Sequence, residues 1–302
     1  MTGLFDPRQV RRAFSRASDS YDAAATLQHA IEAQLLESLD YLDQRVPEVV
    51  LDLGCGPGTA AAAMQARWPR AQVIAMDLAL PMLRHARVAR DWRHPFARHP
   101  LRVCADARAL PLADASVDVL FSNLCLQWTE DLPAVFAGFR RVLKPGGLLL
   151  CSTFGPATLQ ELRDAFAQAE QSSPNPAPHV SPFATIAQFG DALMQSGFRD
   201  PVLDRDTIVR GHGDVQSLMR ELRALGATNA LATRRRTLTG RARFRAAAAA
   251  YEVERRDDGL LPSSWEVITA MAWAPEPGTP IRSGGFDEVS VPVSKIRIRQ
   301  RP

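Results

Sequence analysis

The stretch that decides the fold is Leu51-Asp52-Leu53-Gly54-Cys55-Gly56-Pro57-Gly58-Thr59. An apolar run, Val49–Leu53, leads into three glycines at alternate positions, and a helical pattern begins at Thr59. A strand, a glycine turn and a helix bring the backbone close to a nucleotide-like ligand, because glycine tolerates positive φ and has no side chain to block the approach. The stretch therefore predicts a ligand site at the carboxyl end of a buried strand.

Working outward from this stretch, short apolar runs alternate with helical patterns from Val49 to about Ser152. Near-continuous apolar runs are typical of parallel strands that are covered on both faces. The predicted strands are Val49–Leu53, Gln72–Met76, Leu101–Cys104, Val117–Ser122 and Leu148–Thr153. The predicted helices between them are Thr59–Ala66, Pro81–Arg90 and Pro133–Val142. This alternation predicts an α/β fold with a doubly wound parallel sheet.

Helical patterns flank this core on both sides. Val10–Ser18 and Leu27–Leu42 precede the first strand, and Lys144-Pro145-Gly146-Gly147 predicts a turn directly before the fifth. Beyond the fifth strand, the predicted elements are the helices Leu159–Glu170, Ile186–Gln195, Val215–Leu225 and Arg241–Val253 and the strands Pro201–Val209 and Trp265–Ala274. The helices from Leu159 onward are partly an insertion around the late strands, where we expect a helical lid over a substrate.

The bulk composition is that of an ordinary globular protein. The chain has 302 residues, of which 46% are hydrophobic, and a formal net charge of +3. No apolar run approaches the about 20 residues needed to cross a bilayer, and Met1–Arg12 has no apolar signal core. We therefore expect a cytoplasmic protein without membrane contact. The four cysteines lack the paired spacing of a zinc site, so we predict no bound metal.

The spacing of the three glycines separates this turn from the dinucleotide fingerprint G-x-G-x-x-G. Here the third glycine comes one residue early, as Gly54-x-Gly56-x-Gly58. Asp52 also places a carboxylate where a pyrophosphate would be repelled. A ligand with an ammonium group and no phosphate fits better, and S-adenosylmethionine is such a ligand.

Polar residues stand where the next three strands end. Asp77 closes the second strand, where a carboxylate can accept hydrogen bonds from both hydroxyls of a ribose. Asp106 follows the third strand and can accept a bond from an adenine amino group, and Asn123 follows the fourth, beside the expected reacting centre. A strand-ending aspartate alone is often only a helix cap, so the prediction depends on the markers occurring together and in this order.

This combination resembles the class I methyltransferases over Val49 to Thr153. The resemblance implies a Rossmann-like, mostly parallel seven-stranded sheet whose last strand, Trp265–Ala274, runs antiparallel. It also implies S-adenosylmethionine as the cofactor and S-adenosylhomocysteine as its product. The predicted cofactor-binding residues are Asp52, Gly54, Cys55, Gly56, Gly58, Asp77, Leu78, Met82, Asp106, Ala107, Asn123 and Leu124.

On this basis we expect one methyltransferase domain over residues 1–275. Its N-terminal helices occupy 1–45, the cofactor-binding core 46–153, the helical insertion and sixth strand 154–255, and the last strand 256–275. Residues 276–302 form a C-terminal extension with no assigned role. Its alternating run Val289–Ile298 suits an edge strand or a flexible tail equally well.

Further segments narrow the choice of methyl acceptor. They include residues 13–22, 122–128, 152–162, 218–229 and 238–241. Together these segments resemble the malonyl-acyl carrier protein O-methyltransferases of biotin synthesis, from about Val10 to Trp273. The resemblance implies methyl transfer to the free carboxylate of a malonyl thioester. Masking that charge lets fatty-acid synthesis elongate the chain toward pimeloyl, and the implied partner is an acidic acyl carrier protein.

The acceptor implied by this resemblance needs little from the protein besides a cation. A malonyl monothioester is ionised at neutral pH, so no strong general base is required. An arginine fork suits its carboxylate best, and the candidates are Arg220 and Arg223, three residues apart on one predicted helix. Tyr21 is a third candidate, placed to close the cofactor pocket, and Gln127 and Trp128 are candidates to line the acceptor pocket. A surface role for each arginine and a packing role for each aromatic remain open.

A cluster of arginines lies near the end of the predicted insertion. It consists of Arg234, Arg235, Arg236, Arg241, Arg243 and Arg245. A solvated helix face is one interpretation, and a docking surface for the acidic carrier protein through Arg234, Arg235, Arg236 and Arg241 is the other. Nucleic acid is not expected as a partner, because the cluster has no interleaved aromatic residues and matches no binding module.

Two other functions stay open at this stage. A class I methyltransferase of another small acid or of a quinone-like acceptor would share the cofactor region but would not need Arg220 or Arg223 if its acceptor were uncharged. A non-catalytic protein that retains the fold would be expected to lose the cofactor acids, whereas Asp52, Asp77 and Asp106 are all present.

Overall fold

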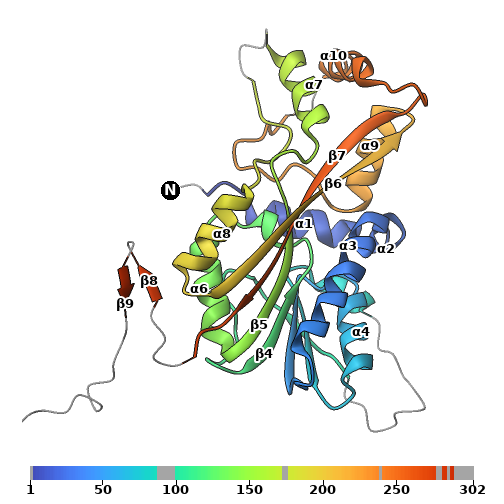
Figure 1. The fold of residues 1–302 in the computed structure, drawn as a ribbon. Helices are drawn as coiled ribbons and strands as arrows, with labels where there is room; N and C mark the ends of the chain where they lie inside the picture. The colour runs from blue at the N-terminus through green and yellow to red at the C-terminus, as the bar shows by residue number, and fades with distance from the viewer. Residues whose placement is uncertain are drawn as a thin grey trace, which may run out of the picture.

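The computed structural model describes residues 3–86, 99–171, 176–237, 240–276, 281–283 and 286–288. Within these residues, seven strands form one sheet in the order β3-β2-β1-β4-β5-β7-β6 (Figure 1). They are β1 (Val49–Leu53), β2 (Gln72–Asp77), β3 (Leu101–Cys104), β4 (Val117–Ser122), β5 (Leu143–Phe154), β6 (Arg199–His212) and β7 (Leu261–Trp273). Strands β1 to β5 are parallel to one another, as the helices between the apolar runs predict.

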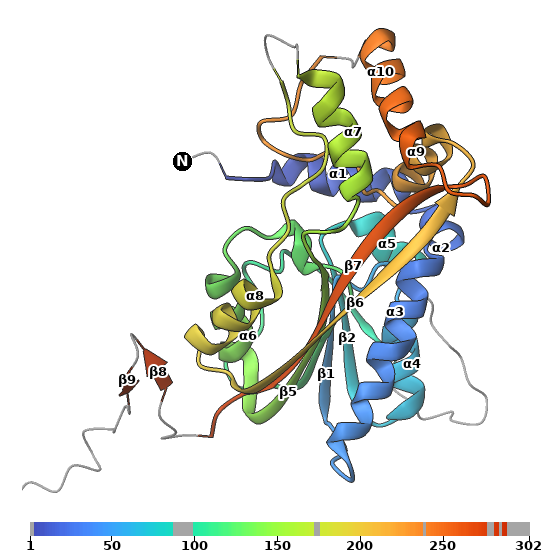
Figure 2. The same ribbon diagram turned by 45° about the horizontal axis from the view of Figure 1, so that its top comes forward.

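Helices cover both faces of the sheet. One face carries α3 (Thr26–Glu37) and α4 (Thr59–Arg67), and the other carries α6 (Leu132–Val142) and α8 (Ile186–Gln195) (Figure 2). The other elements are α1 (Pro7–Ala17), α2 (Tyr21–Ala24), α5 (Leu80–His85), α7 (Gln160–Glu170), α9 (Val215–Ala224) and α10 (Arg241–Tyr251), the 3-10 turns η1 (Ser38–Leu42), η2 (Leu126–Trp128) and η3 (Glu252–Glu254), and a separate hairpin of β8 (Ile281–Ser283) and β9 (Phe286–Glu288).

The sheet divides the core into two layers. On one face, Phe136 of α6 and Phe189 of α8 meet edge to face with their ring centres 5.1 Å apart. On the other face, Leu35 of α3 and Met64 of α4 pack against β1 and β2. All four side chains are buried, and burying a large apolar side chain contributes about 1.5–3 kcal/mol. These two layers fix the carboxyl ends of the parallel strands, where the candidate site lies.

The predicted antiparallel strand is β7, which pairs antiparallel with both β5 and β6. The predicted α/β fold with a mostly parallel seven-stranded sheet is therefore confirmed. β5 ends opposite Val267, whereas β6 continues along β7 as far as Leu261. The antiparallel pair of β6 and β7 thus extends past the rest of the sheet toward α7, α9 and α10 (Figure 1).

Local sequence explains where the helices beside the site begin. Asp6 caps α1 by accepting the backbone N–H groups of Arg8 and Gln9, and Pro7 stands at the first helical position. Asp214 and Ser217 form a reciprocal capping box at the start of α9. The ends of α1 and α9 are therefore set by their own side chains, and both helices go on to line the site.

Two predictions about elements differ from the structure, and one helix was not predicted. The predicted turn Lys144–Gly147 lies inside β5, where the register passes from Val117 opposite Leu143 to Val119 opposite Leu148, so it forms a bulge within the strand. The predicted helix Leu27–Leu42 ends at Glu37 and tightens into η1, and α2 was not predicted.

Two further predictions lie partly or wholly outside the described residues. The predicted helix Pro81–Arg90 stops at His85, because Ala86 leaves the helical region with ψ at 121°, and residues 87–90 are not described. The predicted run Val289–Ile298 is not described at all. Among the described residues, no helix combines the length and the apolar character that crossing a bilayer requires.

Candidate active site

The glycine turn lies where β1 meets α4. Gly54 has a φ of +71°, and its backbone N–H donates to the Met76 carbonyl of β2 at 2.8 Å. A Cβ atom on Gly54 would stand 2.6 Å from Cys125 Sγ, so no other residue fits there without displacing the neighbouring segment. Gly58, at φ +79°, precedes the first turn of α4. The turn therefore exposes backbone rather than side chains at the carboxyl edge of the sheet.

Two adjoining cavities open at this edge. The larger, which we call the Asp77 cavity, has a volume of about 100 Å³. The smaller, the Asp52 cavity, has about 20 Å³ and shares Tyr21, Gly54, Gly56 and Asn123 with it. Of the predicted cofactor residues, those that line the Asp77 cavity are Gly54, Gly56, Asp77, Leu78, Met82, Asp106, Ala107, Asn123 and Leu124. Asp52 and Cys55 line the Asp52 cavity, and Gly58 is outside the described linings of both.

Asp77 links the glycine turn to the turn that follows β2. Its Oδ2 accepts the N–H of Gly56 at 3.0 Å, and its Oδ1 accepts the N–H of Ala79 at 2.7 Å. Burial raises the pKa of Asp77 to about 6, although these two hydrogen bonds act in the opposite direction. The carboxylate is thus held at a fixed place beside the cavity, where ligand hydroxyl groups would stabilise its charge.

The Asp52 cavity contains acceptor atoms that lack donors. Asp52 is 2% exposed, and its Oδ2 has no hydrogen-bond partner among the described residues; the same is true of the buried Gln28 Oε1. Burial and the neighbouring Glu32 raise the pKa of Asp52, and burial and Asp22 raise that of Glu32 to about 7. A cation with several N–H donors would pair with these atoms, and an ammonium group is such a cation.

Asp106 carries its own counter-ion. Arg108 donates from Nε and Nη2 to the two oxygens of Asp106 at 2.9 and 2.6 Å, and these hydrogen bonds hold the pKa of that carboxyl below its usual value. Both residues line the Asp77 cavity. Asp106 therefore stays ionised, and Arg108 belongs to the cavity wall although the sequence analysis did not single it out.

Asn123 connects three elements at the edge of the sheet. Its Nδ2 donates to the Gln28 carbonyl of α3 at 3.0 Å, and its Oδ1 accepts the Ser152 hydroxyl of β5 at 2.7 Å. The next residue, Leu124, has a φ of +47°, an uncommon value for a leucine, and its N–H donates to Ser152 Oγ at 2.9 Å. Backbone held in such a conformation is often found at functional sites.

A third cavity of about 540 Å³ lies beside the first two, between α1, α7, α9 and the segment 226–237. We call it the arginine cavity, because three arginines line it, namely Arg223, Arg234 and Arg235. None of the described residues in its lining is Asp or Glu, and most of the wall is apolar. The residues that line both this cavity and the Asp77 cavity are Phe14, Tyr21, Leu124 and Trp128. The carboxylates of the site therefore lie around the Asp77 and Asp52 cavities, where Arg108 is paired with Asp106, and three further arginines lie around the arginine cavity.

Tyr21 lines all three cavities. Its ring approaches the glycine turn, since a Cβ on Gly56 would lie 3.7 Å from Tyr21 Cε1. Burial and the charge of Asp77 raise the pKa of Tyr21 above its ordinary value. The hydroxyl therefore stays protonated at neutral pH and can donate a hydrogen bond where the cavities meet.

The two arginines predicted on α9 are in different environments. Arg223 lines the arginine cavity, and it has no hydrogen bond or ion pair with any other described side chain. Arg220 is exposed, as Arg223 also is, but it donates to the Gln216 carbonyl at 3.4 Å and is outside the described lining of the cavities. The predicted role of Arg220 has no support in this geometry, because only Arg223 lines the cavity although the two residues lie three apart on α9. Gln127 and Trp128 both line the arginine cavity, as predicted.

The predicted docking cluster is divided by the structure. Arg234 pairs with Asp6 at 3.0 Å, and Arg235 pairs with Glu170 at 3.5 Å; both are half-buried in the wall of the arginine cavity. Arg236 and Arg241 are exposed. The four residues therefore do not lie on one fully exposed surface, and docking through Arg234, Arg235, Arg236 and Arg241 stays a prediction.

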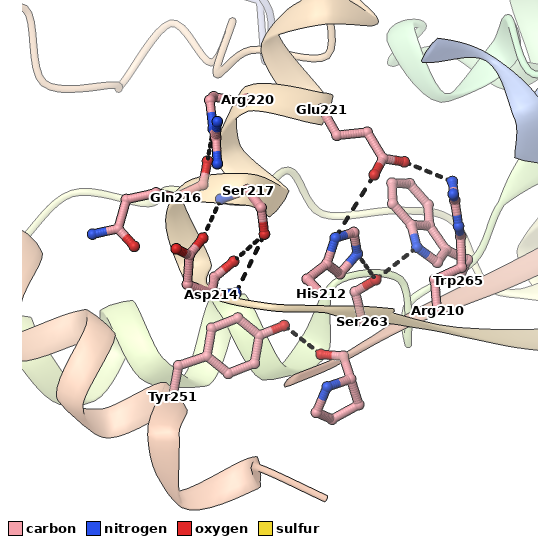
Figure 3. A network of polar contacts seen from close by, with 11 residues as sticks. Arg210, His212, Asp214, Gln216, Ser217, Arg220, Glu221, Tyr251, Ser263 and Trp265 are labelled. Atoms are coloured by element: carbon pink, nitrogen blue, oxygen red, sulfur yellow. Dashed lines mark hydrogen bonds and ion pairs between the residues drawn. The ribbon is translucent and has the colours of Figure 1, made fainter. Parts of the chain in front are cut away.

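A polar network fixes α9 against the antiparallel pair of β6 and β7 (Figure 3). Arg210 of β6 lies 2.6 Å from Glu221 of α9, and His212 Nε2 lies 2.8 Å from Ser263 Oγ of β7, which also accepts the Trp265 indole N–H at 3.1 Å. Burial lowers the pKa of His212, so this ring is neutral at physiological pH. The network orients the helix that presents Arg223.

Sequence reasoning missed the residues that α1 and α3 bring to the site. Phe5, Pro7 and Val10 line the Asp77 cavity, and Gln28 and Glu32 line the Asp52 cavity. The i, i+4 spacing of Val10 and Phe14 indicates an apolar helix face, but that spacing does not reveal which surface the face covers.

Comparison with known proteins agrees with this geometry. Residues 51–151 match a family model described as a methyltransferase domain. The solved structure of the YcgJ protein from Bacillus subtilis has the same fold, with a TM-score of 0.57 and 14% identity over 82% of this chain and 99% of that one. Together with the glycine turn and its acids, these matches define a class I, S-adenosylmethionine-dependent methyltransferase.

Two curated relatives identify the family within this class. The malonyl-[acyl-carrier protein] O-methyltransferase of Xylella fastidiosa (strain M23) is 58% identical over 100% of this chain and 99% of its own length. The protein of the same name from Methylovorus sp. (strain MP688) is 45% identical over 90% of both chains. The chain belongs to the malonyl-[acyl-carrier protein] O-methyltransferase family.

Proposed function

We propose that this chain transfers the methyl group of S-adenosylmethionine to the free carboxylate of a malonyl thioester carried on an acyl carrier protein. The observation that supports this most directly is the division of charge. Carboxylates line the Asp77 and Asp52 cavities, whereas three arginines and no described carboxylate line the arginine cavity. Such a pair of cavities suits a cationic cofactor beside an anionic acceptor.

The acids and the glycine turn would hold the cofactor. Asp52 and Gln28 would accept hydrogen bonds from its ammonium group, Asp77 from its ribose hydroxyls and Asp106 from its adenine. The glycine turn, which has no side chains at Gly54 and Gly56, would leave room for the cofactor to approach the protein backbone. When bound, this cofactor supplies a methyl group attached to a positively charged sulfur, which makes that group reactive.

On the acceptor side, the chain would position the malonyl carboxylate and would not need to activate it. The malonyl carboxylate is ionised near pH 7 and needs no base, so we assign Arg223 to bind and orient it by charge-assisted hydrogen bonds. The protonated Tyr21 hydroxyl would donate a second hydrogen bond where the cavities meet. Phe14, Leu124 and Trp128 would exclude water there, and most of the acceleration would come from this positioning and desolvation.

Release of the product follows from the same charges. The methyl ester is uncharged, so it loses the attraction of Arg223 that held the carboxylate. A masked carboxylate behaves like an ordinary acyl end, which would allow fatty-acid synthesis to extend it toward pimeloyl for biotin. Such use of the methyl ester requires that the acceptor is a malonyl group.

The exposed part of the arginine cluster would receive the carrier protein. Arg236 and Arg241 are exposed, at the end of the segment 226–237 and at the start of α10 respectively. Acyl carrier proteins are acidic, and exposed cations near a cavity steer an acidic partner toward it. We assign docking to Arg236 and Arg241 and reserve Arg234 and Arg235 for the cavity.

The function is tested by methyl transfer to a matched set of thioesters. Malonyl, succinyl and acetyl groups are attached to one carrier protein, and methyl esters are measured by mass with S-adenosylmethionine as the donor. We expect a methyl ester from malonyl, little from the longer diacid and none from acetyl, which has no carboxylate. If no thioester is methylated while S-adenosylhomocysteine still binds, the proposed acceptor is wrong and only the cofactor assignment remains.

A further inference from the structure

The arginine cavity carries more positive charge than one carboxylate needs. Three arginines line it, and Arg223 alone suffices for the malonyl carboxylate in the function proposed above. Its volume of about 540 Å³ is also large, because cavities of about 300–1,000 Å³ enclose drug-sized ligands, whereas a malonyl group has only a few heavy atoms. The remaining space and charge point to a longer ligand with a second anionic group.

Arg234 and Arg235 differ from Arg223 in that both are anchored. Asp6 lies 3.0 Å from Arg234 Nη2, and Arg234 Nη1 also donates to the Leu231 carbonyl at 2.9 Å. Arg235 Nη2 lies 3.5 Å from Glu170 Oε2. The two arginine side chains are 18% and 19% exposed, and both line the cavity. Anchored arginines of this kind form a rigid anion site, since little side-chain entropy is lost on binding.

Glu170 is the centre of the anchoring cluster behind this wall. It is only 3% exposed, yet it lies 3.0 Å from His179 Nε2 and 3.2 Å from Arg243 Nε, and it accepts the N–H of Ala177 at 2.7 Å. Burial opposes its ionisation, but the hydrogen bond of His179 and the charge of Arg243 outweigh burial and leave the pKa of Glu170 below its ordinary value. An ionised carboxylate therefore holds Arg235 in the cavity wall.

The cluster is further fixed by packing. The His179 ring stacks on Phe166 of α7, with the ring centres 4.0 Å apart and the planes within 15°. Both residues line the arginine cavity. Glu170 ends α7, and Arg243 belongs to α10, so the cluster also joins the two helices that lie over this side of the cavity. It is thus built into the fold.

We infer that Arg234 and Arg235 bind the phosphate group of the arm that carries the malonyl thioester, with Glu170 as a positioning residue. This inference rests on the proposed function, because the arm of an acyl carrier protein is a pantetheine chain that ends in a phosphate. The apolar wall accommodates the chain, Arg223 binds the carboxylate at one end, and the anchored pair binds the phosphate at the other. Two adjacent guanidinium forks suit the tetrahedral oxygens of a phosphate.

Two small thioesters that differ only in the phosphate test this subsite. Malonyl-pantetheine and malonyl-4′-phosphopantetheine are compared as methyl acceptors by steady-state kinetics with the full chain. We expect the phosphate to raise kcat/KM about tenfold or more, almost entirely through KM, because the phosphate lies far from the transferred methyl group. Equal kcat/KM values for the two thioesters would contradict the subsite.

Variants locate the effect. We expect the double variant Arg234→Gln/Arg235→Gln to bring the ratio of the two kcat/KM values close to one, and Arg220→Gln, an exposed arginine outside the site, to retain the wild-type ratio. Removal of Arg235 leaves the buried Glu170 with one cation fewer, so Arg235→Gln/Glu170→Gln, which removes both charges, provides a folded alternative. A wild-type ratio in these variants would contradict the assignment.

The outcomes also separate this inference from the proposed function. If the wild-type chain methylates neither thioester, the malonyl acceptor itself is wrong. If it methylates both equally, the function stands and only the phosphate subsite is wrong. Replacement of Glu170 alone by Gln should raise KM for the phosphorylated thioester, leave kcat unchanged and leave KM for malonyl-pantetheine unchanged, a pattern that general loss of structure would not produce.

Discussion

Arg210 Nη1 and Glu221 Oε1 lie 2.6 Å apart, and this ion pair joins the edge strand β6 to the helix that presents Arg223 (Figure 3). The side chains are 30% and 19% exposed, so water screens the pair only in part. The same carboxylate lies 3.7 Å from His212, on its Oε2 side. One glutamate therefore connects α9, which lines the arginine cavity, to the central sheet.

Replacing Glu221 by Gln should loosen this connection. We expect the free energy of unfolding to fall by about 1–3 kcal/mol, because Arg210 loses a charged partner in a partly buried place. KM for the malonyl thioester should rise, whereas the affinity for S-adenosylhomocysteine should not change, since Glu221 is outside the described linings of the Asp77 and Asp52 cavities. Urea denaturation and calorimetric titration measure the two quantities. An equal loss of cofactor affinity would mean that α9 also supports the cofactor side.

A pair of glycine substitutions tests the geometry of the turn. Gly54→Ala should destabilise the protein by about 2–4 kcal/mol and abolish cofactor binding, because the residue has a φ of +71° and its Cβ would stand 2.6 Å from Cys125 Sγ. Gly138→Ala is the control, since that Cβ would meet no described atom within 4 Å and the residue lies inside α6. The control should gain about 0.5–1 kcal/mol. Thermal unfolding with and without S-adenosylhomocysteine distinguishes the two.

Much of the fold is predictable from the sequence because its two signals, apolar runs and the glycines that interrupt them, are local. Apolar runs such as Val117–Ser122 and the interrupting glycines report directly on strands that are buried on both faces. The bulge at Lys144–Gly147 was mistaken for a turn because a Pro-Gly-Gly sequence reads the same in both. The decision between them depends on the pairing of β5 with β4, which is not a local property.

In the candidate site, too, some residues are predictable from local sequence and others depend on contacts between distant segments. Asp77 and Asp106 were predictable because parallel strands end at one edge, so strand-ending acids must converge there. Arg235 and Arg236 are neighbours with the same side chain, yet one lines a cavity and the other faces solvent. The difference comes from Glu170, 65 residues earlier in the chain, which pairs with Arg235. No pattern within the arginine cluster contains that information.

Cofactor binding should depend on pH through the buried acids. Burial raises the pKa of Asp77 to about 6 and, with the charge of Asp22, that of Glu32 to about 7, and the bound cofactor favours the ionised forms. Affinity for S-adenosylhomocysteine should therefore be full above about pH 8 and weaken as the pH falls, by up to about tenfold per unit between pH 7 and 6 and by up to about a hundredfold per unit below pH 6. Calorimetric titration from pH 5 to 8.5 measures this curve.

In the absence of ligand, the stability of the folded protein should change with pH in the direction opposite to that of cofactor affinity. The folded-state pKa of Asp77 lies above its unfolded value, so its ionisation costs stability as the pH rises from about 4 through 6. Asp77→Asn should remove this cost and should also weaken cofactor binding throughout the range. A variant that binds as tightly as the wild type would exclude Asp77 from the cofactor site.

Carrier docking should respond to charge reversal at the exposed arginines. Arg236→Glu/Arg241→Glu should lower kcat/KM for malonyl-acyl carrier protein by about tenfold and reduce its dependence on salt, because an acidic partner would be repelled. Turnover of malonyl-coenzyme A, which has no protein surface, should change much less. Equal losses on the two substrates would place these arginines in the cavity instead of on a docking surface.

Arg223 and Arg220 lie on one helix and provide a matched pair to test whether Arg223 binds the malonyl carboxylate. Arg223→Gln should lower kcat/KM for the malonyl thioester about 10- to 100-fold, because charge-assisted hydrogen bonds to the carboxylate are lost, while Arg220→Gln should leave it unchanged. Arg223→Lys should recover only part of the loss, since an ammonium group cannot bind a carboxylate as a fork. None of these three variants should alter the affinity for S-adenosylhomocysteine. If Arg223→Gln retains full kcat/KM, another cation of the cavity, Arg234 or Arg235, must orient the carboxylate, and the phosphate would have to bind elsewhere.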